Sequence, residues 1–182
     1  LETDARLIRE RADRVVELGE KARVMTRTDP AASVSSQTVD LTGPALQVLE
    51  TFEAQAHGVR FESHLTESLP AVVTDESALR TALQELVENA VEHNDTDDPL
   101  VRIEGERREN AVFLRVVDNG PGVPKAEQEV LQSGTETPLH HGGGMGLWLA
   151  YWSTQAAGGE LSIEQCTEAG SVIELRFSSP ED

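Results

Sequence analysis

Three short segments, far apart in the chain, carry residue types that could bind a nucleoside triphosphate: 85–93, 118–124 and 142–147. The first offers a carboxylate and a carboxamide on a helix, the second a carboxylate in a glycine-rich turn, and the third a glycine run that opens a helix. A triphosphate needs oxygen ligands for its magnesium ion, an acceptor for its base amine, and backbone N–H groups close to its phosphates. We therefore interpret the segments as parts of one nucleotide site.

Asp118 stands at the end of an apolar strand and is followed by Gly120 and Gly122. Asp and Asn before Gly are also common in plain hairpin turns, so an ordinary turn is the alternative. The position at a strand end favours a functional carboxylate, which can accept a hydrogen bond from the exocyclic amine of adenine. The glycines would leave room for a flat base against the backbone.

The glycine run with Gly142, Gly144 and Gly146 leads directly into an apolar helix at Leu147. Unpaired N–H groups and the positive end of the helix dipole at such a position favour phosphate. A flexible linker is the alternative, but a linker would not continue into an apolar helix. A Rossmann motif is excluded because these glycines follow a loop instead of a strand.

Asn89 lies on an apolar helix, with Glu85 one turn before it and His93 one turn after it on the same face. A buried Asn is more often a hydrogen-bonded structural amide than a metal ligand. Amide and carboxylate oxygens nevertheless suit Mg²⁺. We therefore expect Asn89 and Glu85 to hold a magnesium ion and to orient a hydroxyl group or a water molecule.

The elements that must position these residues follow from apolar periodicity. The pattern predicts helices over 42–57, 75–93 and 145–157. It predicts strands over 38–41, 59–65, 71–74, 100–107, 111–117, 160–165 and 171–177. Their irregular alternation indicates an α+β fold, with a mixed sheet covered on one face by helices. Residues 118–141 have few apolar positions and are expected to form a lid or binding loop.

Residues 1–27 contain no proline and predict a long N-terminal helix, followed by a linker to residue 36. Apolar residues recur there every seven positions, as in the seam of a two-helix coiled coil: Leu1, Ile8, Val15 and Ala22. An ordinary amphipathic helix is the alternative. We divide the chain into this helix with its linker, 1–36, and a main domain, 37–182.

Acidic side chains outnumber basic ones by 33 to 15, giving a formal charge of −18. Such a surface disfavours nucleic acid and anionic membrane as partners. No stretch approaches the roughly 18 consecutive apolar residues of a membrane helix, and the single Cys166 fits a reducing, cytoplasmic compartment. Because Lys21 and Lys125 are the only lysines, the composition resembles that of proteins from extreme halophiles. An ordinary acidic cytosolic protein is the alternative.

In order and spacing, the three segments resemble the N box and the two glycine boxes of the ATP-binding catalytic domain of sensor histidine kinases. That family belongs to the Bergerat-type superfamily, shared with gyrase and the mismatch-repair ATPases. The resemblance implies a two-layer α/β sandwich, with a mostly antiparallel mixed sheet under three helices, and it implies ATP and Mg²⁺ as cofactors. It assigns Asn89 as the Mg²⁺ ligand and the following residues to the nucleotide: Asn89, His93, Asp118, Gly120, Gly122, Gly142, Gly144, Gly146, Leu147 and Ser171.

By the same resemblance, the γ-phosphoryl group of ATP passes to a histidine on an upstream helix. Residues 1–27 resemble the second helix of the dimerisation hairpin, which implies a homodimer through this helix and a downstream response regulator. The family's acceptor pattern, His-Glu/Asp-Leu-Arg, occurs at none of the five histidines: His57, His64, His93, His140 and His141. We therefore expect the chain to be trimmed after its acceptor helix and unable to phosphorylate itself.

Two departures from the family pattern open alternatives. Glu85 stands where many members have Asn, and it resembles the general base of the superfamily's ATPases. An ATP-hydrolysing clamp with Glu85 as its catalytic base is therefore one alternative, and an inert nucleotide-sensing scaffold is another. Glu92 stands where a basic residue is common, so other side chains would have to contact the phosphates: His93, His140, His141 or Lys125.

Overall fold

The computed structural model describes residues 36–65, 69–125, 128, 131, 145–167 and 170–179. All of them belong to one compact unit, Val34–Asp182. The predicted N-terminal helix lies outside the described residues, and so do Gly142, Gly144, His140 and His141. Within the described part of the chain, no helix combines the length and the apolar character needed to cross a membrane.

A five-stranded sheet forms one layer of this unit, in the order β2–β4–β5–β7–β6. Its strands are β2 (Arg60–Leu65), β4 (Leu100–Arg108), β5 (Ala111–Asp118), β6 (Glu160–Thr167) and β7 (Gly170–Ser178). The edge strand β2 runs parallel to β4, and all other neighbours in the sheet are antiparallel. The mixed, mostly antiparallel sheet expected from the sequence is confirmed.

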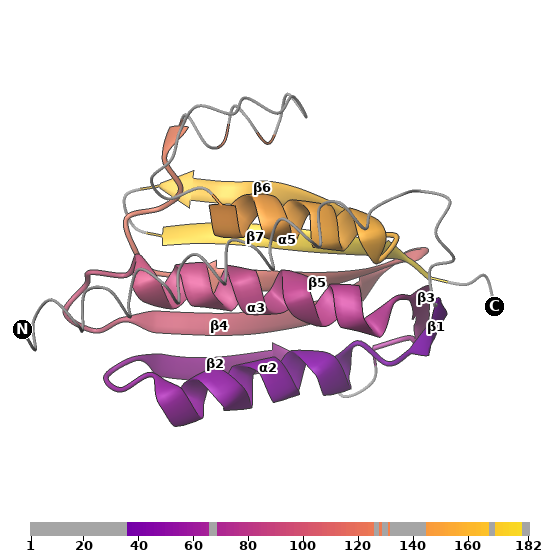
Figure 1. The fold of residues 1–182 in the computed structure, drawn as a ribbon, viewed down its shortest axis with the longest axis horizontal. Helices are drawn as coiled ribbons and strands as arrows, with labels where there is room; N and C mark the ends of the chain where they lie inside the picture. The colour runs from indigo at the N-terminus through magenta and orange to yellow at the C-terminus, as the bar shows by residue number, and fades with distance from the viewer. Residues whose placement is uncertain are drawn as a thin grey trace, which may run out of the picture. The chain divides into compact units, whose positions relative to one another are not determined.

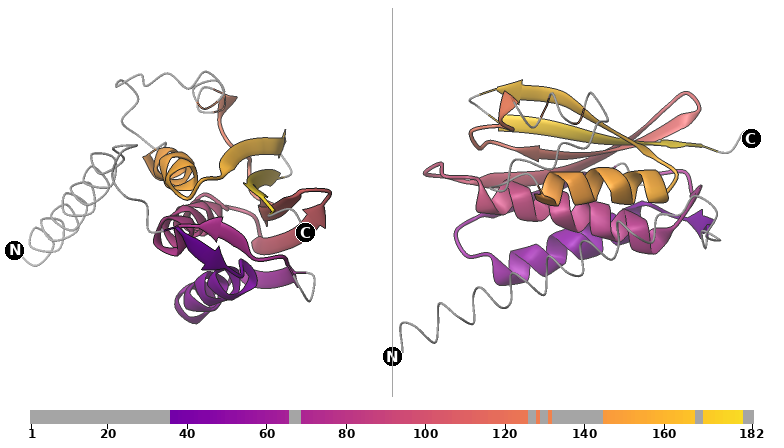
Figure 2. Two further views of the ribbon diagram at one scale, coloured as in Figure 1. Left: turned by 90° about the vertical axis from the view of Figure 1, so that its right-hand side faces the viewer. Right: turned by 45° about the horizontal axis from the view of Figure 1, so that its top comes forward.

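Three helices form the second layer: α2 (Thr42–Gln55), α3 (Glu76–Glu92) and α5 (Met145–Ala156). They lie side by side over one face of the sheet (Figure 1), and the left view of Figure 2 shows the two layers edge-on. A short antiparallel pair, β1 (Gln37–Val39) with β3 (Val72–Thr74), stands apart from the five-stranded sheet. The predicted sandwich with three helices on one face is therefore confirmed, while β1 belongs to a separate pair.

The central helix, α3, begins at a side-chain cap. The carboxylate of Asp75 accepts a hydrogen bond from the backbone N–H of Ala78 at 3.0 Å, which satisfies one of the free donors of the first turn. Leu79, Leu83 and Val87 then recur at helical spacing, and each is fully buried. This apolar stripe fixes the rotation of α3 about its axis and so determines where its polar residues Glu85 and Asn89 lie.

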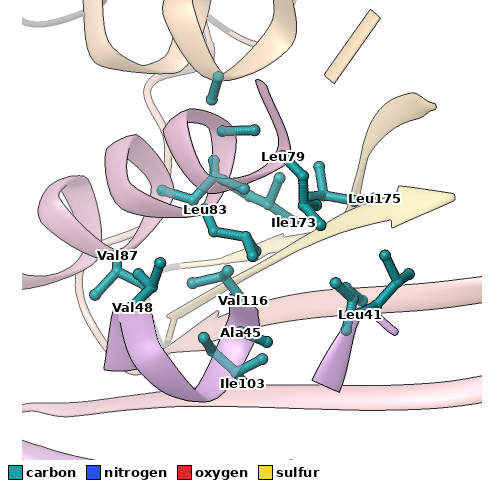
Figure 3. Packing of buried hydrophobic residues seen from close by; sticks show 14 of the residues in the cluster. Leu41, Ala45, Val48, Leu79, Leu83, Val87, Ile103, Val116, Ile173 and Leu175 are labelled. Carbon is teal, nitrogen blue, oxygen red and sulfur yellow. The ribbon is translucent and has the colours of Figure 1, made fainter. Parts of the chain in front are cut away.

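Side chains from both layers meet in one core (Figure 3). Leu83 of α3 points toward Val116 of β5, Val87 of α3 lies beside Val48 of α2, and Ile103 of β4 lies beside Ala45 of α2. Each such side chain stabilises the fold by roughly 1.5–3 kcal/mol relative to its exposed state. The core therefore holds α3 firmly against the strand that ends at Asp118.

The opposite face of the sheet carries a buried guanidinium. Arg115 of β5 is 8% exposed. It contacts Glu106 at 2.7 Å, Glu164 at 2.9 Å and Glu174 at 2.8 Å. Burial raises the pKa of Glu174 although the hydrogen bond from Arg115 opposes this shift, whereas the hydrogen bond from Arg115 lowers the pKa of Glu106. A buried charge of this kind is tolerated because it is paired.

Candidate functional site

The carboxylate of Asp118 is held at the end of β5 by hydrogen bonds to both of its oxygens. Oδ1 accepts from the backbone N–H of Gly120 at 2.8 Å, and Oδ2 accepts from the hydroxyl of Ser171. Asp118 and Ser171 are also direct partners in the β5–β7 ladder. Two residues far apart in the sequence, both predicted for the site, are thus brought together on neighbouring strands.

Three glycines shape the backbone around Asp118. At Gly170, where φ is +133°, an added Cβ would lie 2.1 Å from the carbonyl oxygen of Asp118. At Gly120, an added Cβ would lie 3.1 Å from Asp118 Oδ1 and 3.4 Å from the Cα atom of Asn94. Gly122 adopts φ of +80°, which side chains disfavour. The strand end is therefore open to close approach only because these positions lack side chains.

Asn119 is a site residue that the sequence did not reveal. Its Oδ1 accepts from Asn94 Nδ2 at 2.8 Å and from the Leu100 backbone N–H at 2.8 Å, and its Nδ2 donates to the Asp98 carbonyl oxygen at 2.9 Å. These partners precede Asn119 by 19 to 25 positions. An Asn before Gly is an ordinary turn residue in the local pattern, so no local signal marked it.

The N-terminal turn of α5 lies directly against the polar side chains of α3. A Cβ added at Gly146 would lie 2.7 Å from Asn89 Oδ1, 2.9 Å from Asn89 Nδ2 and 3.1 Å from Glu85 Oε2. The side chain of Glu85 is 8% exposed. Gly146, predicted from the segment 142–147, therefore forms one cluster with Asn89 and Glu85 from the segment 85–93.

The Asn89 carboxamide has an unused donor. Its Nδ2 atom is buried and has no hydrogen-bond partner among the described residues. Oδ1 and Nδ2 exchange places when the amide rotates, so the group can instead present its oxygen at this position. An unpaired amide is costly unless a ligand satisfies it.

The donor set around Asn89 suits Mg²⁺. Amide and carboxylate oxygens are hard ligands, and a Mg²⁺ ion that is bound together with substrate phosphates needs only one or two protein ligands. In the described part of the chain, no group of three or more His, Cys, Asp or Glu residues is placed to hold a metal ion. The residues present therefore fit an ion that is shared with a phosphate ligand.

The other predicted residues occupy the margins of this cluster. His93 is exposed at the C-cap of α3, one turn beyond Asn89, and its backbone N–H donates to the Asn89 carbonyl oxygen at 3.1 Å. The side chain of Leu147 is 5% exposed and packs in the core, so a ligand contact from Leu147 would involve its backbone. Lys125 is exposed just beyond the glycine-rich turn.

Known proteins with the same pattern are kinases and related ATPases. A model of the family described as "Histidine kinase-, DNA gyrase B-, and HSP90-like ATPase" matches residues 74–181. The signal transduction histidine-protein kinase AfsQ2 of Streptomyces coelicolor is 27% identical over 187 residues, which cover 100% of this chain and 34% of AfsQ2. AfsQ2 is much longer than this chain, as is the sensor protein KdpD of Mycobacterium tuberculosis, which is 30% identical over 60% of this chain and 13% of KdpD; the chain spans about a third of the length of these relatives or less.

Two solved structures share the fold. Full-length ShkA, solved in complex with AMPPNP, matches with a TM-score of 0.78 and 25% identity, over 96% of this chain and 38% of ShkA. The histidine kinase AdeS of Acinetobacter baumannii matches with a TM-score of 0.74 and 19% identity, over 94% of this chain and 82% of the AdeS chain.

Proposed function

Because the chain belongs to the family of histidine kinase-, DNA gyrase B- and HSP90-like ATPases, we propose that it is the ATP-binding catalytic domain of a sensor histidine kinase. The observation that carries the proposal is the Asp118 carboxylate, fixed at a strand end by Ser171 and by the Gly120 N–H. A carboxylate there accepts the amine of adenine. Guanine presents a carbonyl oxygen at the corresponding edge, so Asp118 would select against GTP.

The cluster of Asn89, Glu85 and Gly146 is the proposed phosphate half of the site. Asn89 would hold Mg²⁺ through its amide oxygen, and the ion when bound supplies positive charge that stabilises the triphosphate. Gly146 brings the N-terminal turn of α5 close to this point, where backbone N–H groups can receive phosphate oxygens. Gly142 and Gly144 would extend the same cradle.

Glu85 is the proposed catalytic base. A neutral imidazole nitrogen of the acceptor histidine attacks the γ-phosphorus of ATP, and the bond between that phosphorus and the bridging oxygen of ADP breaks. The other ring nitrogen then gives its proton to the carboxylate of Glu85. Most of the rate enhancement in such transfers comes from positioning and charge stabilisation, so we expect Glu85 to contribute less than the bound geometry does.

The buried carboxylate of Glu85 also supports a second candidate, in which it activates a water molecule and the domain hydrolyses ATP as a clamp. ADP release without any acceptor histidine separates this candidate from the kinase. An inert nucleotide-sensing scaffold would bind ATP but would produce neither ADP nor phosphohistidine.

The partners follow from the kinase proposal. The acceptor histidine would lie on a helix of the same or a partner kinase chain, a response regulator would receive the phosphoryl group, and residues 1–27 would pair with a second copy. Because Glu92 cannot contact phosphate favourably, we propose that His93 and Lys125 take that role. A cytoplasmic location remains a prediction from the single Cys166.

Calorimetry followed by phosphotransfer tests the proposal. The chain should bind Mg-ATP and not Mg-GTP, and it should label a separately supplied acceptor-helix polypeptide with acid-labile phosphate. Asn89→Ala should remove the gain in ATP affinity that magnesium provides. Equal affinity for ATP and GTP would refute the role of Asp118, and ATP binding with neither labelling nor ADP release would favour the scaffold.

A further inference from the structure

The segment that leaves α3 is folded around the side chain of Asn119. The Asn119 side chain accepts from Asn94 and from the Leu100 N–H and donates to the Asp98 carbonyl oxygen. The segment also has an internal hydrogen bond, in which Asn94 Oδ1 accepts from the hydroxyl of Thr96 at 2.7 Å. Asn119 therefore accepts two hydrogen bonds and donates one, and its partners lie 19 to 25 positions earlier in the sequence.

This carboxamide joins two parts of the site that carry different chemistry. Asn119 directly follows Asp118, which would accept the adenine amine. Asn94 directly follows the C-cap of α3, one turn beyond Asn89 on the helix that carries the phosphate-side residues. The Cα atom of Asn94 also lies 3.4 Å from the point that a Cβ of Gly120 would occupy. The end of α3 and the end of β5 are thus packed together and tied by one side chain.

We propose that Asn119 is a positioning residue that sets the separation between the adenine-binding half and the phosphate-binding half of the site. This inference rests on the proposed function. A nucleoside triphosphate must engage Asp118 and Asn89 at the same time, so its affinity depends on the distance between them. Adenosine engages only the half around Asp118, which Ser171 and the Gly120 N–H hold through hydrogen bonds that do not involve the Asn119 side chain.

The two ligands separate positioning from a merely structural role. In Asn119→Ala and Asn119→Asp, the affinity for adenosine should stay within about twofold of the parent. The additional affinity of Mg-AMPPNP over adenosine should fall about tenfold, because without the bonds to Asn94, Leu100 and Asp98 the two halves of the site are no longer held at a fixed separation. Asn119→Asp keeps the two acceptor bonds but turns a carboxylate oxygen toward the carbonyl oxygen of Asp98, which repels it, so a loss of similar size is expected. Asn110→Ala, an exposed Asn in the β4–β5 turn, is the matched control and should change neither value.

A double variant gives a second measurement. If Asn119 acts through Asn94, then Asn94→Ala should reduce the affinity for Mg-AMPPNP, and combining it with Asn119→Ala should add little further loss. Variants that melt earlier but keep the parental ratio of the two affinities would overturn the inference. So would an equal loss for adenosine and for Mg-AMPPNP. A parent chain that binds neither ligand would instead refute the proposed function, and a failure of Asn119→Ala to fold leaves Asn119→Asp and Asn94→Ala to decide.

Discussion

Replacing Gly146 with alanine would place a methyl group at the contact between α5 and α3. The new carbon would lie 2.7 Å and 2.9 Å from the two terminal atoms of Asn89 and 3.1 Å from Glu85 Oε2. Real Cβ atoms essentially never have neighbours closer than 3.0 Å. Asn89 would therefore have to change its rotamer, or α5 would have to move outward by several tenths of an ångström.

The effects on folding and on binding should differ in size. Alanine is the better helix former by about 1 kcal/mol, and overpacking costs about 1–3 kcal/mol. The free energy of unfolding should therefore fall by no more than about 2 kcal/mol. Displacing Asn89 from its supporting contact should weaken Mg-ATP binding by about 10- to 100-fold.

Gly43 provides the matched control, because it occupies the same second position in α2 that Gly146 occupies in α5. A Cβ at Gly43 would have no neighbour within 4 Å. Gly43→Ala should therefore stabilise the fold by up to about 1 kcal/mol and leave ATP binding unchanged. Urea denaturation and calorimetry measure the two quantities, and the reasoning is wrong if Gly146→Ala binds Mg-ATP as tightly as Gly43→Ala does.

Four further outcomes are expected. Asp118→Asn should weaken ATP binding by at least tenfold with little change in melting temperature, since an amide presents a donor to the adenine amine; equal calorimetric affinity would remove Asp118 from the site. Because salt screens the repulsion within a protein of formal charge −18, the melting temperature and the ATP affinity should both rise between dilute buffer and molar KCl. A melting temperature that stays constant or falls with added KCl would contradict a halophilic adaptation. Burial raises the pKa of Glu174, so its contribution to stability is complete at low pH and is lost as the pH rises through the folded pKa. When the pH rises through this range, the melting temperature of Glu174→Gln should fall less than that of the parent. An equal fall in melting temperature for both proteins would contradict this expectation. Ser153 has a buried hydroxyl without a hydrogen-bond partner among the described residues. Ser153→Ala should therefore raise the free energy of unfolding, measured by urea denaturation, by about 1 kcal/mol. A lower urea midpoint for the variant would show that this hydroxyl is hydrogen-bonded in the folded protein.

Local patterns predicted the elements well because their causes are local. The alternation of apolar residues placed the strand ending at Val117 within one residue of β5, and the helix expected over 75–93 does begin next to Asp75, whose carboxylate accepts from the N–H of Ala78. Gly146 and Asn89, taken from two separate segments of the sequence, do lie close together in space, while the nucleotide roles of the three boxes stay predictions.

Features that depend on distant pairing could not be read from the sequence. The parallel alignment of Arg60 with Leu100 places β2 at the sheet edge, and nothing near either residue encodes it. The same holds for Arg115, whose three glutamate partners come from three different strands. Asn119 is the most instructive example, because its local sequence is that of a plain turn while its hydrogen bonds are all long-range.

The pairing of Asp118 with Ser171 in the β5–β7 ladder has a consequence for how the intervening chain can evolve. Asp118 and Ser171 are held next to each other by the backbone pairing of β5 with β7, and none of the residues in that pairing belongs to the stretch between Lys125 and Met145. The entropy of closing a loop grows only with the logarithm of its length, and doubling the length adds about 0.6 kcal/mol. We therefore expect insertions and deletions between Lys125 and Met145 to be tolerated by the fold, with β5 and β7 keeping their register.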